Sequence, residues 1–145
     1  MNRPEKIPGY LFVLLVVYCL ASFVHFAHNA EFISSYPNLP ASLTRSGIYI
    51  SWLLVTVVGI VGVLLVRLGL RVLGLFFAAG YAILGLAGLD HYARAPMSQH
   101  SLAMNATILF EVFAAAALLF ASVVLLFRSL SRRWSLGSSG GLQNE

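Results

Sequence analysis

Histidine and carboxylate side chains, which serve most often in proton transfer and metal binding, are scarce in this chain. His25 and His28 stand one helical turn apart in an apolar stretch, and Glu31 follows after one more turn. Glu111 is the single charged residue of the last apolar stretch. Imidazole with carboxylate suits Zn, Cu or Fe, and it also suits general acid–base catalysis. The pattern indicates a transition-metal site of His25, His28 and Glu111, or a catalytic pair.

Polar side chains form a stripe on the first predicted helix. Spacings of four, three and four residues separate Tyr18, Ser22, His25 and Asn29, and at about 100° per residue they fall within an arc of about 60°. His25 and Glu111 each lie about 12 to 14 Å inside the outer end of their helices. Because lipid cannot satisfy either side chain, we expect the two to face one another or to share a bridging group.

The other acids and histidines extend this candidate site. Asp90 and His91 end the third apolar stretch, and His100 precedes the fourth, so both of these histidines are expected near the surface. The inner half has arginines at its boundary and few polar residues within. We therefore predict a polar pocket in the outer half, with the following candidate residues: Tyr18, His25, His28, Asn29, Glu31, Asp90, His91, His100 and Glu111.

Four long apolar stretches must carry these side chains. About 20 apolar residues in a helix cross a hydrocarbon core of about 30 Å, and a backbone in lipid must satisfy its own hydrogen bonds. We predict an all-α fold, an antiparallel bundle of four transmembrane helices with both termini cytoplasmic. The single domain covers residues 1–134 and a disordered cytoplasmic tail covers 135–145, with helices at about 8–31, 47–66, 72–90 and 101–128.

Composition supports a membrane protein. The chain is 59% apolar and only 10% charged, against roughly 25% charged residues in soluble domains, which excludes an ordinary cytosolic enzyme. The lipid bilayer is therefore the expected partner. No nucleic-acid partner is expected, because the basic residues form no dense run.

The basic residues predict the orientation. Only Arg45 and Arg94 flank the outer side, and by the positive-inside rule the other side is cytoplasmic in a bacterial-type inner (plasma) membrane. A cleaved signal peptide is the alternative for the first stretch, but no clean A-x-A site follows it. The seven basic residues on the inner side are Arg3, Lys6, Arg67, Arg71, Arg128, Arg132 and Arg133.

Two further features bear on partners. Gly74, Ala78 and Ala82 recur every four residues, a pattern that lets helices approach closely within the bundle or in a homo-oligomer, or against another membrane subunit. Pro37 and Pro40 stiffen the outer connection. We expect that connection either to cap the bundle like a lid or to serve only as a rigid connector.

Three interpretations of the polar residues stay open. In the first, Glu111 only pairs with His25 or a hydroxyl and is structurally satisfied. In the second, the pocket binds a metal ion, a haem or a polar ligand. In the third, His25 and Glu111 serve a proton or solute pathway, or an enzyme with a lipid-soluble substrate. The sequence favours a membrane binding or assembly module. The alternative is a small membrane enzyme or a metal-binding protein using His25, His28 and Glu111, and enzymatic activity is left open.

Overall fold

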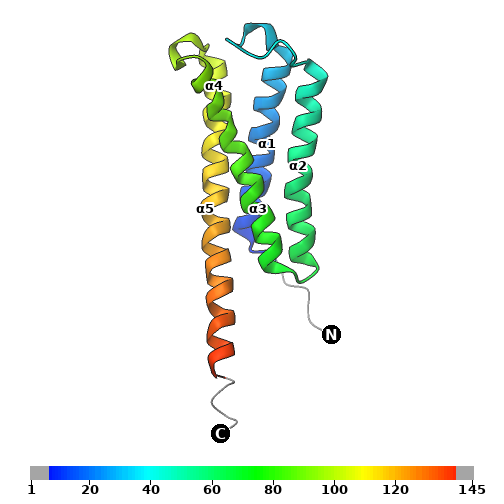
Figure 1. Ribbon diagram of the computed structural model, residues 1–145, viewed down its shortest axis with the longest axis vertical. Coiled ribbons are helices and arrows are strands. Elements are labelled where there is room, and N and C mark those ends of the chain that lie inside the picture. The colour runs from blue at the N-terminus through cyan, green and yellow to red at the C-terminus, as the bar shows by residue number, and fades with distance from the viewer. Residues whose placement is uncertain (1–6, 140–145) are drawn as a thin grey trace.

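The computed structural model describes residues 7–139 (Figure 1). All regular structure in this part of the chain is helical, without any strand. The order is α1 (Gly9–Glu31), η1 (Ile33–Ser35), α2 (Arg45–Arg67), α3 (Arg71–Leu86), η2 (Ala87–Leu89), α4 (Asp90–Arg94), η3 (Met97–Gln99) and α5 (Leu102–Ser139), where η marks a short 3-10 turn.

Four helical segments are long and apolar enough to cross a membrane. They are Gly9–Glu31, Arg45–Arg67, Arg71–Arg94 and Leu102–Arg132, and the third of them comprises α3, η2 and α4. The prediction of an all-α chain with four such helices is confirmed for the described residues.

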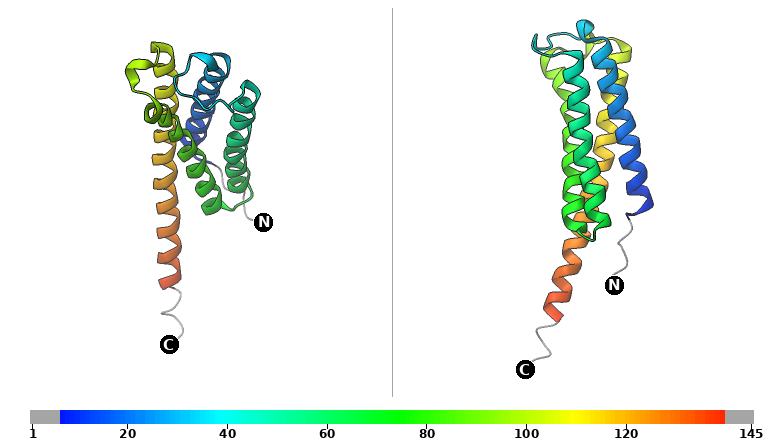
Figure 2. Two further views of the ribbon diagram at one scale, coloured as in Figure 1. Left: turned by 45° about the horizontal axis from the view of Figure 1, so that its top comes forward. Right: turned by 90° about the vertical axis from the view of Figure 1, so that its right-hand side faces the viewer.

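The four long helices α1, α2, α3 and α5 lie side by side (Figures 1 and 2). α3 packs between α2 and α5, and α1 packs against α5 and α2. One end of the bundle carries the connections 32–44 and 95–101, and we call it the loop end. The other end carries the short connection between Arg67 and Arg71, and we call it the arginine end; α5 extends well beyond it (Figure 2).

Local sequence explains where the helices begin and end. The Thr44 hydroxyl accepts a hydrogen bond from the backbone N–H of Gly47 (3.1 Å), which caps the first turn of α2. Gly69 adopts a φ of +83°, a left-handed conformation that favours glycine and closes the turn into α3. Ala95 is extended (φ −154°, ψ 144°), as expected for a residue before proline, and α4 ends there.

Small residues set the distance between α2 and α3. A Cβ added to Gly74 would lie 2.7 Å from the carbonyl oxygen of Gly62 and 2.8 Å from the backbone nitrogen of Val66. Ala78 and Ala82 on the same face of α3 are also buried. The predicted small-residue face of α3 is therefore used for packing within this chain.

Two boundaries differ from those predicted. The third helix is broken at residues 87–89, and α4 continues it in a short separate helix. α5 continues past the predicted end at 128 to Ser139, because no proline interrupts this leucine-, serine- and arginine-rich segment. Residues 135–139 of the predicted disordered tail are therefore helical, and 140–145 lie outside the described residues.

Candidate functional site

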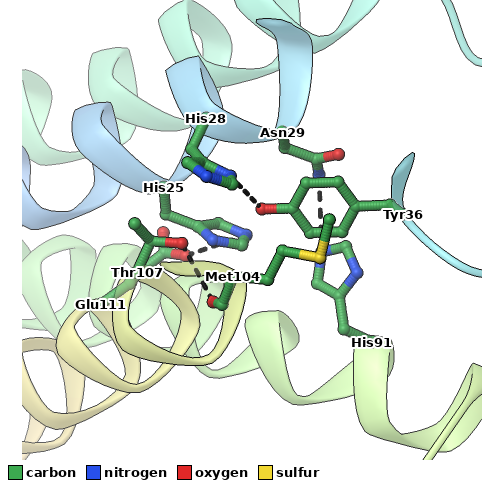
Figure 3. A network of polar contacts seen from close by, with 8 residues as sticks. All are labelled: His25, His28, Asn29, Tyr36, His91, Met104, Thr107 and Glu111. Atoms are coloured by element: carbon green, nitrogen blue, oxygen red, sulfur yellow. Dashed lines mark hydrogen bonds and ion pairs between the residues drawn. The ribbon is translucent and has the colours of Figure 1, made fainter. Parts of the chain in front are cut away.

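A buried histidine and a buried carboxyl group face one another near the loop end of the bundle (Figure 3). Nε2 of His25 on α1 lies 3.7 Å from Oε2 of Glu111 on α5, and both side chains are almost fully buried. A Cβ added to Gly88 of η2 would lie only 3.3 Å from Oε2 of Glu111, so the carboxyl group packs against that turn. The expectation that His25 and Glu111 meet is confirmed.

His91 and His100 are also buried, with 8% and 6% of their surface exposed. Their predicted surface position is therefore wrong. The turn η2 ends α3 and lets α4 carry His91 inward, where its ring centroid lies 5.2 Å from that of His25 and 6.1 Å from that of His100. Nδ2 of Asn29 donates a hydrogen bond of 3.4 Å to Nε2 of His91, which joins α1 to α4.

Tyr36, in the connection between α1 and α2, points into this group of residues (Figure 3). Its hydroxyl lies 2.8 Å from Nδ1 of His28, and its ring centroid lies 5.1 Å from that of His91. Only 4% of Tyr36 is exposed, and burial raises the pKa of its hydroxyl to about 12. Nδ2 of Asn38 donates to the carbonyl oxygen of Arg94 (2.8 Å), so the connection is tied to the end of α4. The connection thus covers the loop end of the bundle.

Tyr36 is the residue of this site that the sequence reasoning missed. The run Tyr36-Pro37-Asn38-Leu39-Pro40 indicates a stiff connection, but nothing in it shows which way the tyrosine points. The available signal for the burial of Tyr36 was that a large aromatic residue stands immediately before Pro37. We call the group that the structure brings together the histidine cluster, and it consists of His25, His28, Asn29, Tyr36, His91, His100 and Glu111.

Two predicted pocket residues lie at the surface, outside the histidine cluster. Glu31 is exposed, and its Oε1 accepts hydrogen bonds from Nη2 of Arg45 (2.6 Å) and from the hydroxyl of Tyr49 (2.8 Å). This interaction fixes the end of α1 to the start of α2 at the surface. Asp90 is exposed at the start of α4. Both residues are therefore surface groups.

Tyr18, another predicted pocket residue, lies deeper in the bundle. It is fully buried, and its ring centroid lies 4.4 Å from that of Tyr81 on α3. A Cβ added to Gly85 would lie within 2.4 Å of the Tyr18 hydroxyl, so glycine is needed for this approach. The two tyrosines therefore belong to the apolar core with Leu11 and Leu15 rather than to the histidine cluster.

The predicted metal site is not supported. Nδ1 of His28 is engaged with Tyr36, whereas Nε2 of His25 faces Glu111, so the two histidines have different partners. Among the described residues, no three histidine, cysteine, aspartate or glutamate side chains are arranged to hold a metal ion. The HxxH spacing placed both histidines on α1, but one turn separates them by enough rotation that they find different partners.

Among the described residues, five of the eleven buried side-chain polar atoms without a hydrogen-bond partner belong to the histidine cluster. A buried donor or acceptor left unpaired costs about 1–3 kcal/mol, so several in one place are a marked local cost. Within the part of the chain that the structure describes, the unpartnered atoms of the histidine cluster are Nδ1 of His25, Oδ1 of Asn29, Nδ1 of His91, Nε2 of His100 and Oε1 of Glu111.

Within residues 7–139, the geometry defines an all-helical fold with four helices able to cross a membrane and a buried histidine–carboxyl cluster near one end. Comparison with protein families, with curated proteins and with solved structures finds no match.

Proposed function

We propose that this chain is a small integral membrane protein of a bacterial-type inner membrane, with an antiparallel bundle of four spans in one domain, residues 1–134. The proposal places both termini in the cytoplasm. Its support is the position of seven of the nine basic residues, including Arg67 and Arg71, toward one side of the predicted spans. Reporter fusions after residue 40 or residue 96 should report an external location, and a cytoplasmic signal from either would contradict the orientation.

Within this fold, we propose that the histidine cluster binds a small polar ligand and that the protein serves as a membrane binding module. The observation that carries the proposal is the set of unpartnered buried atoms, to which His25, His91 and Glu111 each contribute one. A hydrogen-bonding ligand offsets the cost of burying them. Packing alone gives no reason to gather five such atoms in one place.

The chemistry of the histidine cluster limits the ligand. Glu111 is its one acid, and the imidazoles of His25, His91 and His100 can each donate or accept a hydrogen bond. Such a site suits a small neutral or cationic molecule with several hydrogen-bonding groups better than it suits an anion. Tyr36 covers the loop end, so the ligand would enter there when the 32–44 connection opens.

The test is native mass spectrometry of the protein released from mild detergent. The mass of the intact protein is compared with its mass after denaturation, and the difference is the mass of the bound molecule. We expect the wild-type chain to carry one small molecule and Glu111→Gln to carry about fivefold less, the effect of losing one hydrogen bond of the carboxyl group. Ser122→Ala is the matched control, because Ser122 is an unpartnered buried residue on the same helix outside the histidine cluster. A wild-type chain without bound mass, or equal occupancy in Glu111→Gln, would contradict the proposal.

A second function, proton-transfer catalysis, is favoured by one observation. The 3.7 Å approach of His25 Nε2 and Glu111 Oε2 places a general acid and a general base side by side in a buried site. Such a pair can remove a proton from a bound molecule and return one to it. The experiment is to incubate the purified protein in D2O and to weigh the bound molecule. Catalysis predicts deuterium incorporation that His25→Asn abolishes, whereas simple binding predicts none at carbon.

A further inference from the structure

A second site lies on the outside of the bundle and is lined by no residue of the histidine cluster. A groove of about 340 Å3 lies between α1 and α2, with Tyr81 of α3 at its base. Its walls are almost entirely apolar, and Phe12, Val16 and Ile60 are between 42% and 52% exposed. The residues that define its walls and ends are Phe12, Val16, Thr56, Ile60, Val63 and Arg67.

The length of the groove matches one leaflet of a bilayer. Along α2 it extends from Thr56 to Arg67, eleven residues or about 16 Å at the rise of an α-helix. Half of a hydrocarbon core of about 30 Å is about 15 Å. A lipid acyl chain lying along α2 would therefore fill the groove from the middle of the membrane to the arginine end.

Arg67 gives the groove a charged end. It is the last residue of α2, and its side chain is exposed where the groove meets the arginine end. The neighbouring Arg71 points elsewhere, since its Nε donates to the hydroxyl of Ser129 (3.2 Å). A guanidinium group at this depth is placed for a lipid phosphate, and basic pockets between transmembrane helices recognise anionic head groups. We infer that the groove binds an anionic phospholipid, with one acyl chain between α1 and α2 and the phosphate on Arg67.

The groove is separate from the histidine cluster. Tyr81 lies at the base of the groove and packs against Tyr18 with its ring tilted by 55°, and both tyrosines are almost fully buried. Gly59 lets the Tyr81 ring lie against α2, because a Cβ there would come within 2.6 Å of the ring. Tyr18 does not line the groove, and no residue of the histidine cluster does. The lipid site can therefore be tested independently of the ligand proposed for the histidine cluster.

The probe is an equimolar mixture of phosphatidylglycerol and phosphatidylcholine with identical acyl chains, added to detergent-solubilised protein and read by native mass spectrometry. We expect phosphatidylglycerol to be bound about fivefold more than phosphatidylcholine, the ratio expected for one basic residue near an anionic head group. Arg67→Gln should abolish the preference. Arg128→Gln, which removes a charge from exposed α5 outside the groove, should retain it.

The acyl-chain part of the inference has its own pair of variants. Val16→Phe fills the groove and should reduce bound lipid of both kinds several-fold, whereas Val13→Phe, on an exposed position of α1 outside the groove, should not. Ile60→Phe repeats the test from α2 should Val16→Phe fold poorly. Equal binding of the two lipids would overturn the inference, and so would equal effects of the two arginine variants. A dimer of this chain that covers the groove and carries no lipid would overturn it as well.

Discussion

The two halves of the bundle are built from the same helices but differ in the side chains that fill their interiors. Toward the arginine end and at mid-bundle, the interior is filled by apolar side chains such as Leu11, Leu15, Leu75 and Leu118, and glycines bring α2 and α3 together. Toward the loop end, the interior holds His25, Glu111 and the rest of the histidine cluster. The first region is mainly apolar and has scattered unpaired polar atoms such as the hydroxyls of Tyr18, Tyr81 and Ser122, whereas the second gathers five unpaired atoms in the histidine cluster.

The two halves contribute differently to stability and to function. In lipid, helices associate through close packing rather than through hydrophobic burial, so the apolar half supplies most of the association energy. The polar half reduces that energy, because unpaired buried groups are costly. A region that lowers stability and still gathers four histidines and a carboxyl group is the better candidate for function.

The largest effect is expected in the apolar half. Gly74→Ala places a Cβ against the backbone of Gly62 and Val66, which α2 and α3 can relieve only by moving apart. We expect a loss of about 3 kcal/mol in the free energy of unfolding, measured by denaturation in bicelles. Gly80→Ala is the control on the same helix, since a Cβ there meets nothing within 4 Å. Comparable losses in the two variants would disprove the tight α2–α3 contact.

The next effect concerns the pair in the polar half. Glu111→Leu leaves Nε2 of His25 buried without its partner, and we expect it to lower the free energy of unfolding by about 2 kcal/mol. The double variant His25→Leu/Glu111→Leu replaces both partners by apolar groups and should return close to the wild-type value. The same bicelle denaturation gives the coupling between the two sites. A double variant that loses as much as the sum of the single ones would show that the two residues do not act as a pair.

A smaller effect is expected where the 32–44 connection covers the histidine cluster. Tyr36→Phe removes the hydrogen bond between the Tyr36 hydroxyl and Nδ1 of His28, which should weaken closure of the connection by about 1 kcal/mol. Amide hydrogen exchange across residues 32–44 should become about fivefold faster. Tyr49→Phe is the control, since Tyr49 donates to exposed Glu31. Unchanged exchange in Tyr36→Phe would mean that ring packing alone holds the connection closed.

The sequence was sufficient for the helices and for the central pair. Long uncharged stretches have one solution in lipid, and helical spacing placed His25 and Glu111 on inward faces at similar depth. Periodicity was also enough to mark Tyr18 and Asn29 as buried. These are consequences of regular geometry, which a sequence determines directly.

The rest depended on irregular segments. The burial of His91 follows from the break at 87–89, and that of Tyr36 follows from the path of a connection containing Pro37. Hydrophobic periodicity predicts neither the break in the helix at 87–89 nor the path of the 32–44 connection. Glu31 was misplaced for a related reason, because a helix end lies close to the next connection and Arg45 was available there as a partner.

The smallest effect is expected at that exposed pair. Arg45→Gln removes the contact with Glu31 at the loop end, outside the histidine cluster. Because both side chains are well exposed, solvent and salt screen their attraction, so the stability change should be slight in dilute buffer and vanish in high salt. Bicelle denaturation at two salt concentrations measures it. A loss of stability that persists in high salt would show that Arg45 also positions the 32–44 connection. The Arg45–Glu31 pair would then contribute to the structure of the polar half of the bundle.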